Sequence, residues 1–198
     1  MYLKKVSDLI FSFLLILLLS PFLIIISLTV KLTSKGPVFF KQRRIGVNRE
    51  EFVIYKFRTM YSETPKNVPT HLLKDPERFI TPIGKFLRKT SLDELPQLFN
   101  ILKGDMSFIG PRPALYNQED LIALREEFGV NKIKPGISGW AQVNGRDELE
   151  IPEKVEYDRY YLEHISIRLD LKIIFMTFYN VFFSKGVVEG GTGKSIQN

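Results

Sequence analysis

The sequence contains no cysteine and only two histidines, His71 and His164, in 198 residues. The lack of cysteine excludes disulfides, thiolate nucleophiles and cysteine-ligated zinc or iron–sulfur sites. The shortage of histidine excludes histidine clusters as metal or acid–base sites. Any catalysis by this chain would therefore depend on carboxylates, lysine, arginine, hydroxyl groups or a metal ion held mainly by oxygen.

Acidic residues are also fewer than basic ones, 22 against 28, and the formal net charge is +6. A positive balance favours anionic partners such as phosphate esters, acidic lipid headgroups or nucleic acid, and charge alone does not choose among them. A chain of this length can bury one good core. We therefore expect one catalytic domain with appendages.

The N-terminal region contains a long stretch without charge, from Leu9 to Val30. A helix of roughly 22 residues, at about 1.5 Å per residue, reaches about 33 Å and can cross a bilayer. No signal-peptide cleavage site, which would consist of small residues two positions apart, follows the run, and Lys31 and Lys35 come directly after it. A retained anchor over residues 1–35 is therefore favoured over a cleaved signal peptide.

Positive charge flanks the anchor on both sides, with Lys4 and Lys5 before it and further basic residues after it. The preference for positive charge on the cytoplasmic side would place both ends there, which a helix that bends back on itself allows. Ser20 and Pro21 offer a break midway: Pro21 removes a backbone donor, and the Ser20 hydroxyl can bond a carbonyl freed by the bend. From these residues alone, a kinked single-pass helix stays equally open.

The region that follows, residues 36–188, is predicted to form an α+β, mainly helical catalytic domain, with a flexible tail over 189–198. Aromatic and β-branched runs at 37–42 and 51–58, separated by Gly46 and Asn48, predict a β-hairpin. Residues 61–79 and 134–140 are rich in turn-forming residues and are predicted as loops.

Helical periodicity predicts helices over the segments 81–87, 92–102, 115–128, 152–163 and 169–183. Gly104 should end the second of these. The last is strongly amphipathic, so it belongs either to the core or to the headgroup region of a membrane.

Two adjacent carboxylates, Asp93 and Glu94, are predicted at a helix start, directly after cationic residues. A helix N-terminus stabilises carboxylates, and neighbouring side chains point about 100° apart, so the two can divide two roles. One could attack phosphorus while the other holds a metal or a hydrogen-bond network. The structural alternative is that Ser91 and Glu94 form a capping box, and spacing alone favours this alternative.

Arg112 lies between Pro111 and Pro113. Fixed φ angles on both sides reduce the freedom that Arg112 would lose on binding, which suits recognition of a phosphate by two hydrogen bonds. The alternative is a rigid surface turn with a solvated arginine. A third polar segment, 142–146, ends in another arginine, Arg146.

These segments, in this order, resemble the bacterial sugar transferase family of monotopic phosphoglycosyl transferases, which start glycoconjugate assembly on undecaprenyl phosphate. The match covers nearly the whole chain. It consists of Ser20-Pro21, the hairpin from 36–40 to 55–60, S-L-D-E-L-P-Q at 91–97, G-D-M-S-F-I-G-P-R-P at 104–113, and the segment from P-G at 135–136 to N-G-R at 144–146.

The resemblance implies a re-entrant anchor on the cytoplasmic face of the bacterial inner membrane, with interfacial amphipathic helices. It implies that Asp93, paired with Glu94, attacks the β-phosphorus of a UDP-sugar, that UMP leaves, and that polyprenyl phosphate then takes the phosphosugar from Asp93. It further implies a Mg²⁺ ion that touches Asp93 and the diphosphate. The expected substrate-binding residues are Arg88, Arg112 and Arg146, with Gln142, Asp158 and Lys56 as weaker candidates.

The expected partners are a UDP-sugar, polyprenyl phosphate and the lipid bilayer, without nucleic acid, and a homodimer is left open. Because the sequence starts directly with the apolar run, we expect no further transmembrane bundle. Two other functions stay open: a membrane-attached glycosyltransferase that releases UDP, and a basic adaptor without activity that binds acidic lipids.

Overall fold

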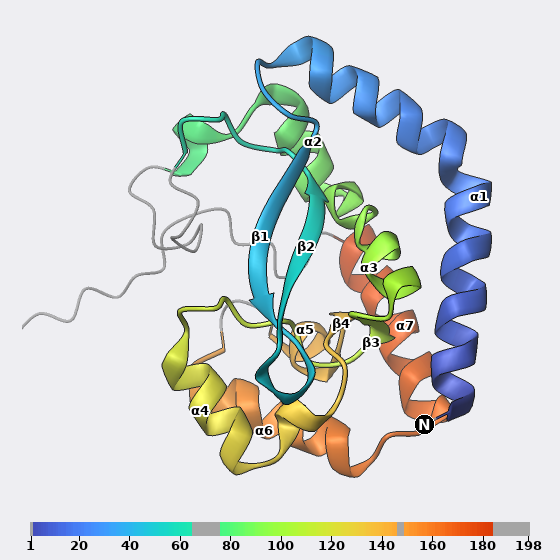
Figure 1. Cartoon of the computed structure of the whole chain (residues 1–198), viewed down its shortest axis with the longest axis vertical. Helices are drawn as coiled ribbons and strands as arrows, with labels where there is room; N and C mark the ends of the chain where they lie inside the picture. The colour runs from blue at the N-terminus through green and yellow to red at the C-terminus, as the bar shows by residue number, and fades with distance from the viewer. Residues whose placement is uncertain (1, 65–75, 146–148, 184–198) are drawn as a thin grey trace, which may run out of the picture.

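The computed structural model describes residues 2–64, 76–145 and 149–183. The chain begins with the long helix α1 (Tyr2–Thr33), followed by the strands β1 (Phe39–Ile45) and β2 (Glu51–Phe57). These strands form an antiparallel hairpin in which Phe39 pairs with Phe57 and Ile45 with Glu51. The predicted hairpin is confirmed, and it runs through the middle of the molecule (Figure 1).

Short helices and a second small sheet complete the described part of the chain, which is mostly helical. They are, in order, α2 (Pro82–Lys89), α3 (Gln97–Lys103), β3 (Ser107–Ile109), α4 (Glu119–Glu127), β4 (Gly136–Ser138), α5 (Trp140–Asn144), α6 (Ile151–Glu163) and α7 (Ile167–Phe182). Short 3₁₀ turns lie at Val47–Arg49, Pro76–Phe79, Leu92–Glu94 and Val130–Lys132.

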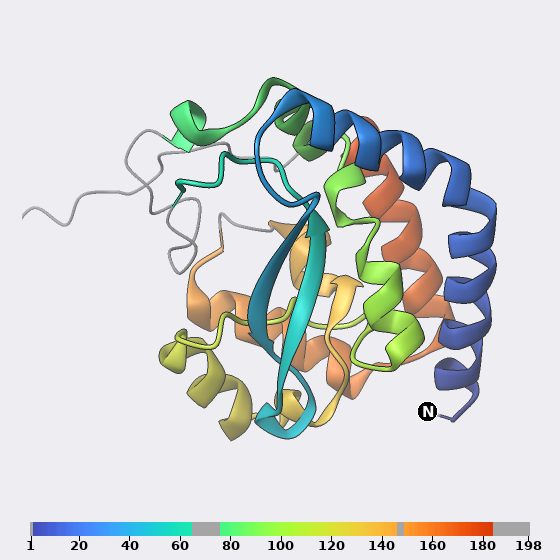
Figure 2. The same cartoon turned by 45° about the horizontal axis from the view of Figure 1, so that its top comes forward.

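Helix α1 contains Pro21 in its interior and remains one continuous helix of 32 residues. Pro21 cannot donate to the carbonyl four residues earlier, that of Leu17. The Ser20 hydroxyl donates to this Leu17 carbonyl at 2.8 Å and so replaces the missing bond, as predicted. Figures 1 and 2 both show α1 bending over the top of the molecule.

Both ends of α1 are attached to the rest of the fold. Near the N-terminus, the Lys4 ammonium lies 2.5 Å from the Asp170 carboxylate of α7. Near the C-terminus, the buried Arg58 guanidinium donates to the Val30 carbonyl at 3.2 Å and to the Ser34 carbonyl at 2.7 Å. The two ends are therefore held by a single domain.

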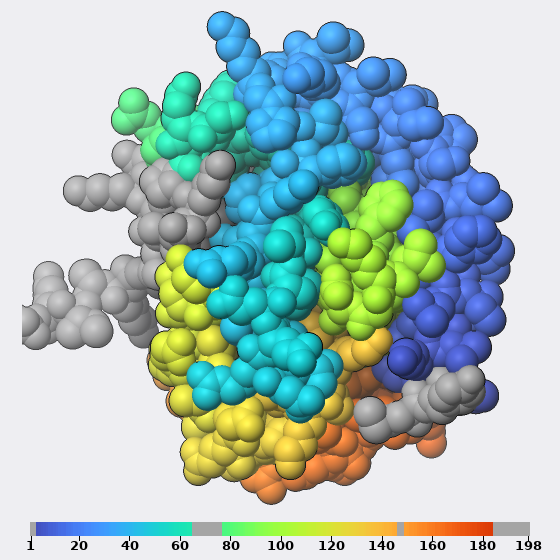
Figure 3. All heavy atoms as spheres, viewed as in Figure 1, coloured from blue at the N-terminus to red at the C-terminus, as the bar shows by residue number. Residues whose placement is uncertain are grey.

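The inner face of α1 packs on that domain. Leu23, Ile26 and Val30 form a core cluster with Phe57 of β2 and Leu87 of α2. A second cluster joins the first half of α1 to β2 and α3 through Ile54, Leu98, Ile101 and Met106. Figure 3 shows the side chains of α1 forming one edge of the molecule.

The outer faces of α1 and α7 are apolar and exposed. On α7, Phe175 and Phe178 are 71% and 72% exposed, and Phe182 is 82% exposed. On α1, the exposed apolar residues continue from Leu3 to Leu32. By length and composition, α1 is the one helix among the described residues that could cross a membrane. Large exposed apolar surfaces of this kind mark interaction sites with a membrane or a partner.

The predicted helix from Leu92 to Leu102 is wrong in its first half, and so is the capping box. Residues Leu92–Glu94 form a 3₁₀ turn, and α3 begins only at Gln97, because Pro96 has no N–H to continue a regular helix. Ser91 adopts a left-handed conformation, with φ 55°, and its side chain makes no capping bond. Gly104 does end α3, in a left-handed conformation.

The predicted loop over 134–140 is also wrong, because β4 pairs there in parallel with β3. The two strands approach so closely that a Cβ on Gly136 would lie 2.1 Å from the Gly110 nitrogen. The predicted charged helix 115–128 is shorter than expected and begins at Glu119. Most of the predicted loop 61–79 and the predicted tail lie outside the described residues.

Candidate active site

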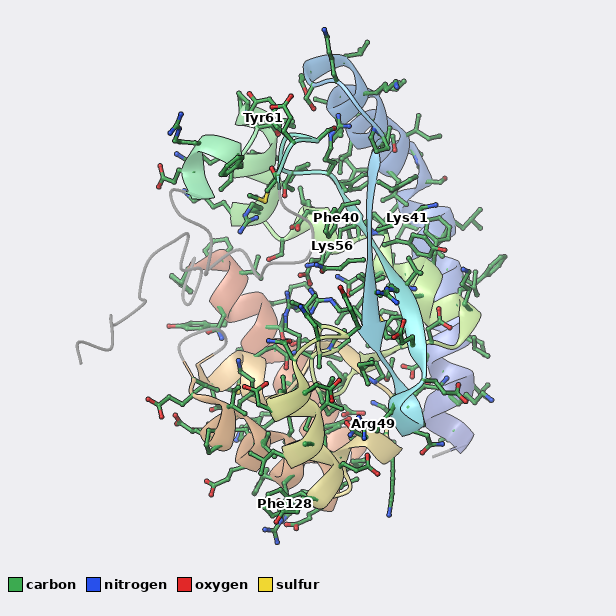
Figure 4. All side chains as sticks on the ribbon, turned by 60° about the vertical axis from the view of Figure 1, so that its left-hand side comes forward. Phe40, Lys41, Arg49, Lys56, Tyr61 and Phe128 are labelled. Atoms are coloured by element: carbon green, nitrogen blue, oxygen red, sulfur yellow. The ribbon has the colours of Figure 1, made fainter. Side chains whose placement is uncertain are left out.

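Asp93 and Glu94 lie on the short turn Leu92–Glu94, between α2 and α3. The left-handed Ser91 directs the chain out of α2 and into this turn. Lys56 comes from β2, and Arg112 from the loop after β3. Residues far apart in the sequence thus meet beside the hairpin, where Figure 4 shows Lys56 near the middle of the molecule.

Glu94 is the centre of an ionic cluster. Its Oε1 atom accepts a bond from the Lys56 ammonium at 2.6 Å and one from the Arg112 guanidinium at 3.1 Å. The residue is only 8% exposed. A buried carboxylate with two cationic donors is held in place strongly, and it fixes both cations in turn.

Asp93 is half-buried beside this cluster. Burial and, to a smaller extent, the charge of Glu94 raise the pKa of its carboxyl to about 6, although the charges of Lys56, Arg88 and Arg112 act in the opposite direction. A carboxylate with a pKa near 6 is ionised at neutral pH and retains basicity, as a nucleophile requires. Three cations around it favour the binding of an anionic substrate.

Lys56 has a pKa that burial lowers, opposed by the charge of Glu94. Arg88 belongs to the last turn of α2, is half-buried and contributes to the field at Asp93. The structure therefore brings together five predicted residues: Lys56, Arg88, Asp93, Glu94 and Arg112.

The Pro111-Arg112-Pro113 loop is fixed through its backbone as well as by its prolines. The Pro111 carbonyl accepts from the Gly136 nitrogen at 2.9 Å, and the Pro113 carbonyl accepts from Arg44 at 2.9 Å. The Arg112 carbonyl accepts from Arg125 Nη1 at 2.8 Å. Arg112 is thus presented by a rigid loop, which reduces the entropy that it loses on binding.

Asp158 lies outside the cluster and acts on it only through a neighbour. Its Oδ2 atom accepts from Arg125 Nη2 at 2.6 Å and from Nε at 3.0 Å, and both residues are buried. Arg125 connects Asp158 to the backbone of Arg112. Arg125 was not predicted from the sequence. It lies on the same face of α4 as the buried Leu121 and Ile122, and an arginine at such a position indicates a buried ion pair.

Of the two remaining predicted residues, only Gln142 is among the described residues. Gln142 lies on α5, and its amide oxygen and nitrogen are buried without a hydrogen-bond partner among the described residues. Arg146 lies outside the described residues.

A metal ion at this site would depend on few protein ligands. Within the described ranges, no group of three or more histidine, aspartate or glutamate residues could hold one. Glu94 is bonded to two cations, so in the pair the half-buried Asp93 is the carboxylate that would be available to a Mg²⁺ ion. One carboxylate together with substrate phosphates is a donor set that suits Mg²⁺.

Comparisons with known proteins agree with the features above. The family model described as bacterial sugar transferase matches residues 1–184. The UDP-glucose:undecaprenyl-phosphate glucose-1-phosphate transferase of Klebsiella pneumoniae is 45% identical over 192 residues, which cover 93% of this chain and 41% of that protein. The uncharacterized sugar transferase EpsL of Bacillus subtilis is 41% identical over 189 residues, which cover 96% of this chain and 92% of that protein.

A third relative acts on another sugar. It is the UDP-N-acetylgalactosamine-undecaprenyl-phosphate N-acetylgalactosaminephosphotransferase of Aeromonas hydrophila, which is 37% identical over 190 residues. The match covers 93% of this chain and 45% of that relative. The chain thus spans less than half the length of the Klebsiella and Aeromonas relatives.

Proposed function

This chain belongs to the bacterial sugar transferase family, and we propose that it moves a sugar 1-phosphate from a UDP-sugar to undecaprenyl or another polyprenyl phosphate. The observation that carries the proposal is the position of Asp93 beside the Lys56–Glu94–Arg112 cluster. The names of the curated relatives support the same reaction type.

In the first step, an oxygen of the Asp93 carboxylate attacks the β-phosphorus of the UDP-sugar. A bond forms between this oxygen and phosphorus, the bond from phosphorus to the bridging α–β oxygen breaks, and UMP leaves with the electron pair. Lys56, Arg88 and Arg112 supply positive charge for the phosphate oxygens, where charge develops. Glu94 keeps two of these cations in position.

In the second step, a phosphate oxygen of the polyprenyl phosphate attacks the phosphorus of the aspartyl phosphosugar. The bond to Asp93 breaks, the carboxylate is restored, and the product is a polyprenyl diphosphate sugar. The same cations serve both steps, since each step moves negative charge through one phosphorus centre. This order of events predicts ping-pong kinetics.

Asp93 would hold Mg²⁺ together with the diphosphate of the substrate. The ion would neutralise charge on the phosphate oxygens when bound.

We further propose that α1 enters the membrane from the cytoplasmic face and returns to it. The attachment of both helix ends to one domain supports this placement, since a helix that crossed the bilayer would have its ends on opposite sides. The bend stabilised by Ser20, and the exposed apolar faces of α1 and α7, fit a domain that lies against the cytoplasmic side of the inner membrane.

The identity of the released nucleotide tests the reaction. Detergent-solubilised protein is incubated with Mg²⁺, polyprenyl phosphate and a panel of UDP-sugars, and the nucleotide product is separated by chromatography. We expect UMP from the wild type and from Asp120→Asn, a matched change at an exposed position, and none from Asp93→Asn. Release of UDP would instead show a glycosyltransferase. Absence of any nucleotide product across the panel would favour the adaptor and overturn the proposal.

A further inference from the structure

Asn100 is a polar residue in the middle of the apolar part of α3, between Phe99 and Ile101. Its side chain is fully buried, with 0% exposure. A buried amide costs free energy unless its donors and acceptors are bonded, so a polar residue at such a position has a specific partner. Asn100 does not belong to the ionic cluster around Glu94, and its burial needs an explanation of its own.

The amide of Asn100 bonds the backbone of β2. Its Oδ1 atom accepts from the Tyr55 N–H at 3.0 Å, and its Nδ2 atom donates to the Val53 carbonyl at 2.7 Å. The sheet has two strands, so β2 pairs with β1 along its other edge. Figures 1 and 2 both show α3 alongside the hairpin. Asn100 thus bonds one N–H and one C=O of an edge that a third strand would otherwise pair.

Asp105 fixes the orientation of this amide. Asn100 Nδ2 also donates to Asp105 Oδ2 at 3.2 Å, and the Asp105 N–H donates to the Asn100 carbonyl at 3.0 Å. Because an ionised carboxylate only accepts hydrogen bonds, the amide nitrogen must face Asp105 and the amide oxygen must face Tyr55. The link from α3 to β2 therefore has a single orientation.

The same two segments are joined a second time at the candidate active site. Lys56 follows Tyr55 directly on β2, and Glu94 lies on the turn that leads into α3. The Lys56 ammonium donates to Glu94 Oε1 at 2.6 Å. Such a bond depends steeply on distance and angle, so its geometry is set by where β2 lies on α3. Asn100 fixes that position through its bonds to the β2 backbone.

We propose that Asn100 is a positioning residue: by holding the backbone of β2, it keeps Lys56 against Glu94 and so fixes the positive charge beside Asp93. The inference rests on the proposed function, in which Lys56 supplies charge to the phosphate oxygens of the substrate. Asn100 acts only through Lys56 and does not itself contact the substrate. A misplacement of about 1 Å can lower a catalytic rate by about 100-fold, so the loss of this amide should be visible in the kinetics.

Steady-state kinetics of UMP release provide the first measurement. Because Lys56 acts on charge that develops in the transition state, Asn100→Ala should lower kcat by about 10- to 100-fold and change the KM for the UDP-sugar much less. Asn100→Leu fills a similar volume without hydrogen-bonding groups and should show the same loss. Circular dichroism checks that both variants are folded. A wild-type kcat in either folded variant would overturn the inference.

Another buried asparagine provides the matched control. Asn131 is 9% exposed, and its Nδ2 atom donates to the Ile122 carbonyl at 3.1 Å and to Glu126 Oε2 at 2.8 Å. The acceptors are again a backbone carbonyl and a carboxylate, but both belong to α4 instead of β2. Asn131→Ala should therefore lose stability in a similar way and keep kcat within about twofold of the wild type. A loss of kcat as large as that of Asn100→Ala would overturn the inference.

A double-mutant cycle with Lys56 separates positioning from a merely structural role. In the Lys56→Gln background the residue through which Asn100 acts is gone, so Asn100→Ala should lower kcat by no more than about a further twofold. An equal loss in both backgrounds would show that Asn100 acts independently of Lys56. Urea unfolding gives the same cycle without activity: Asn100→Ala should destabilise Lys56→Gln less than it destabilises the wild type, because the Lys56–Glu94 bond is already absent.

The two cycles distinguish failure of this inference from failure of the proposed reaction. If the wild type releases UMP, the kinetic cycle decides, and independent effects of Asn100 and Lys56 overturn the inference alone. If the wild type releases no UMP, the proposed reaction is overturned, and the unfolding cycle decides whether Asn100 places Lys56. Additive losses of stability would then overturn the inference as well.

Discussion

Replacement of the buried Asp158 by alanine tests whether the Arg125–Asp158 pair positions Arg112. Arg125 is 4% exposed and Asp158 is 1% exposed, with two hydrogen bonds between them at 2.6 Å and 3.0 Å. Asp158→Ala leaves a buried guanidinium without its counter-ion. Breaking such a pair from one side lowers the free energy of unfolding by about 3–5 kcal/mol.

An exposed pair on the same helix provides the control. Arg159 and Glu163 lie 2.7 Å apart, four residues apart in sequence, and each side chain is 50% exposed. Because water screens such a pair, Arg159→Gln should lower the free energy of unfolding by no more than about 0.5 kcal/mol. Urea unfolding of the detergent-solubilised variants, followed by the fluorescence of Trp140, the single tryptophan, measures both changes.

A double variant separates stability from positioning. In Arg125→Met/Asp158→Leu no buried charge remains, so most of the lost stability should return. The bond from Arg125 Nη1 to the Arg112 carbonyl stays absent. We therefore expect kcat/KM for UMP release to remain at least about tenfold below the wild type, a loss of about 1.4 kcal/mol. Wild-type activity in this double variant, or a stability loss for Asp158→Ala no larger than that of the exposed control, would refute the reasoning.

Other measurements address the site and the membrane helix. Because the pKa of Asp93 is raised to about 6, the rate of UMP release should increase from pH 5 to a plateau above pH 7. Arg88→Gln removes a nearby cation, which should raise the pKa of Asp93 and shift this increase to higher pH. The pKa of Asp93 is about 3.9 in the unfolded chain and about 6 in the folded one, so the folded state loses stability as the pH rises between these values. Asp93→Asn removes this cost, so it should raise the melting temperature at pH 8 while it abolishes UMP release. Glu94→Gln should lower kcat/KM by about 10- to 100-fold, since each of its two charge-assisted bonds contributes about 1.5–3 kcal/mol. Ser20→Ala should lower the free energy of unfolding by about 1 kcal/mol, because the Leu17 carbonyl then loses its donor. Thr29→Ala should lower it by less, because the Ile25 carbonyl that its hydroxyl bonds is not opposite a proline. Equal losses would contradict the role given to Ser20.

The cluster around Glu94 explains why two adjacent carboxylates have different surroundings. Glu94 is buried and bonded to two cations, whereas Asp93 is half-buried. Neighbouring residues on a turn point in different directions, so one can enter the protein while the other faces the substrate side. The two carboxylates therefore differ in burial and in partners, while their division into a nucleophile and a supporting group stays a prediction.

The local features of this chain were predictable from its sequence. The uncharged run from Leu9 to Val30 indicated a long apolar helix, and the Ser20 bond followed from the missing N–H of Pro21. The hairpin and the helices α6 and α7 were recognised from their periodicity, and Gly104 from its tolerance of a left-handed conformation. Each of these signals arises from residues within a few positions of one another.

Tertiary structure alone decided which of these elements meet. The pairing of β3 with β4 joins segments about 29 residues apart, and no local pattern in 134–140 indicates a strand. The link from Asp158 through Arg125 to Arg112, and the placement of Arg58 behind the end of α1, depend on contacts between distant segments. A motif fixes the chemistry that a side chain can perform, but its partners, its burial and hence its pKa are set only when the chain packs around it.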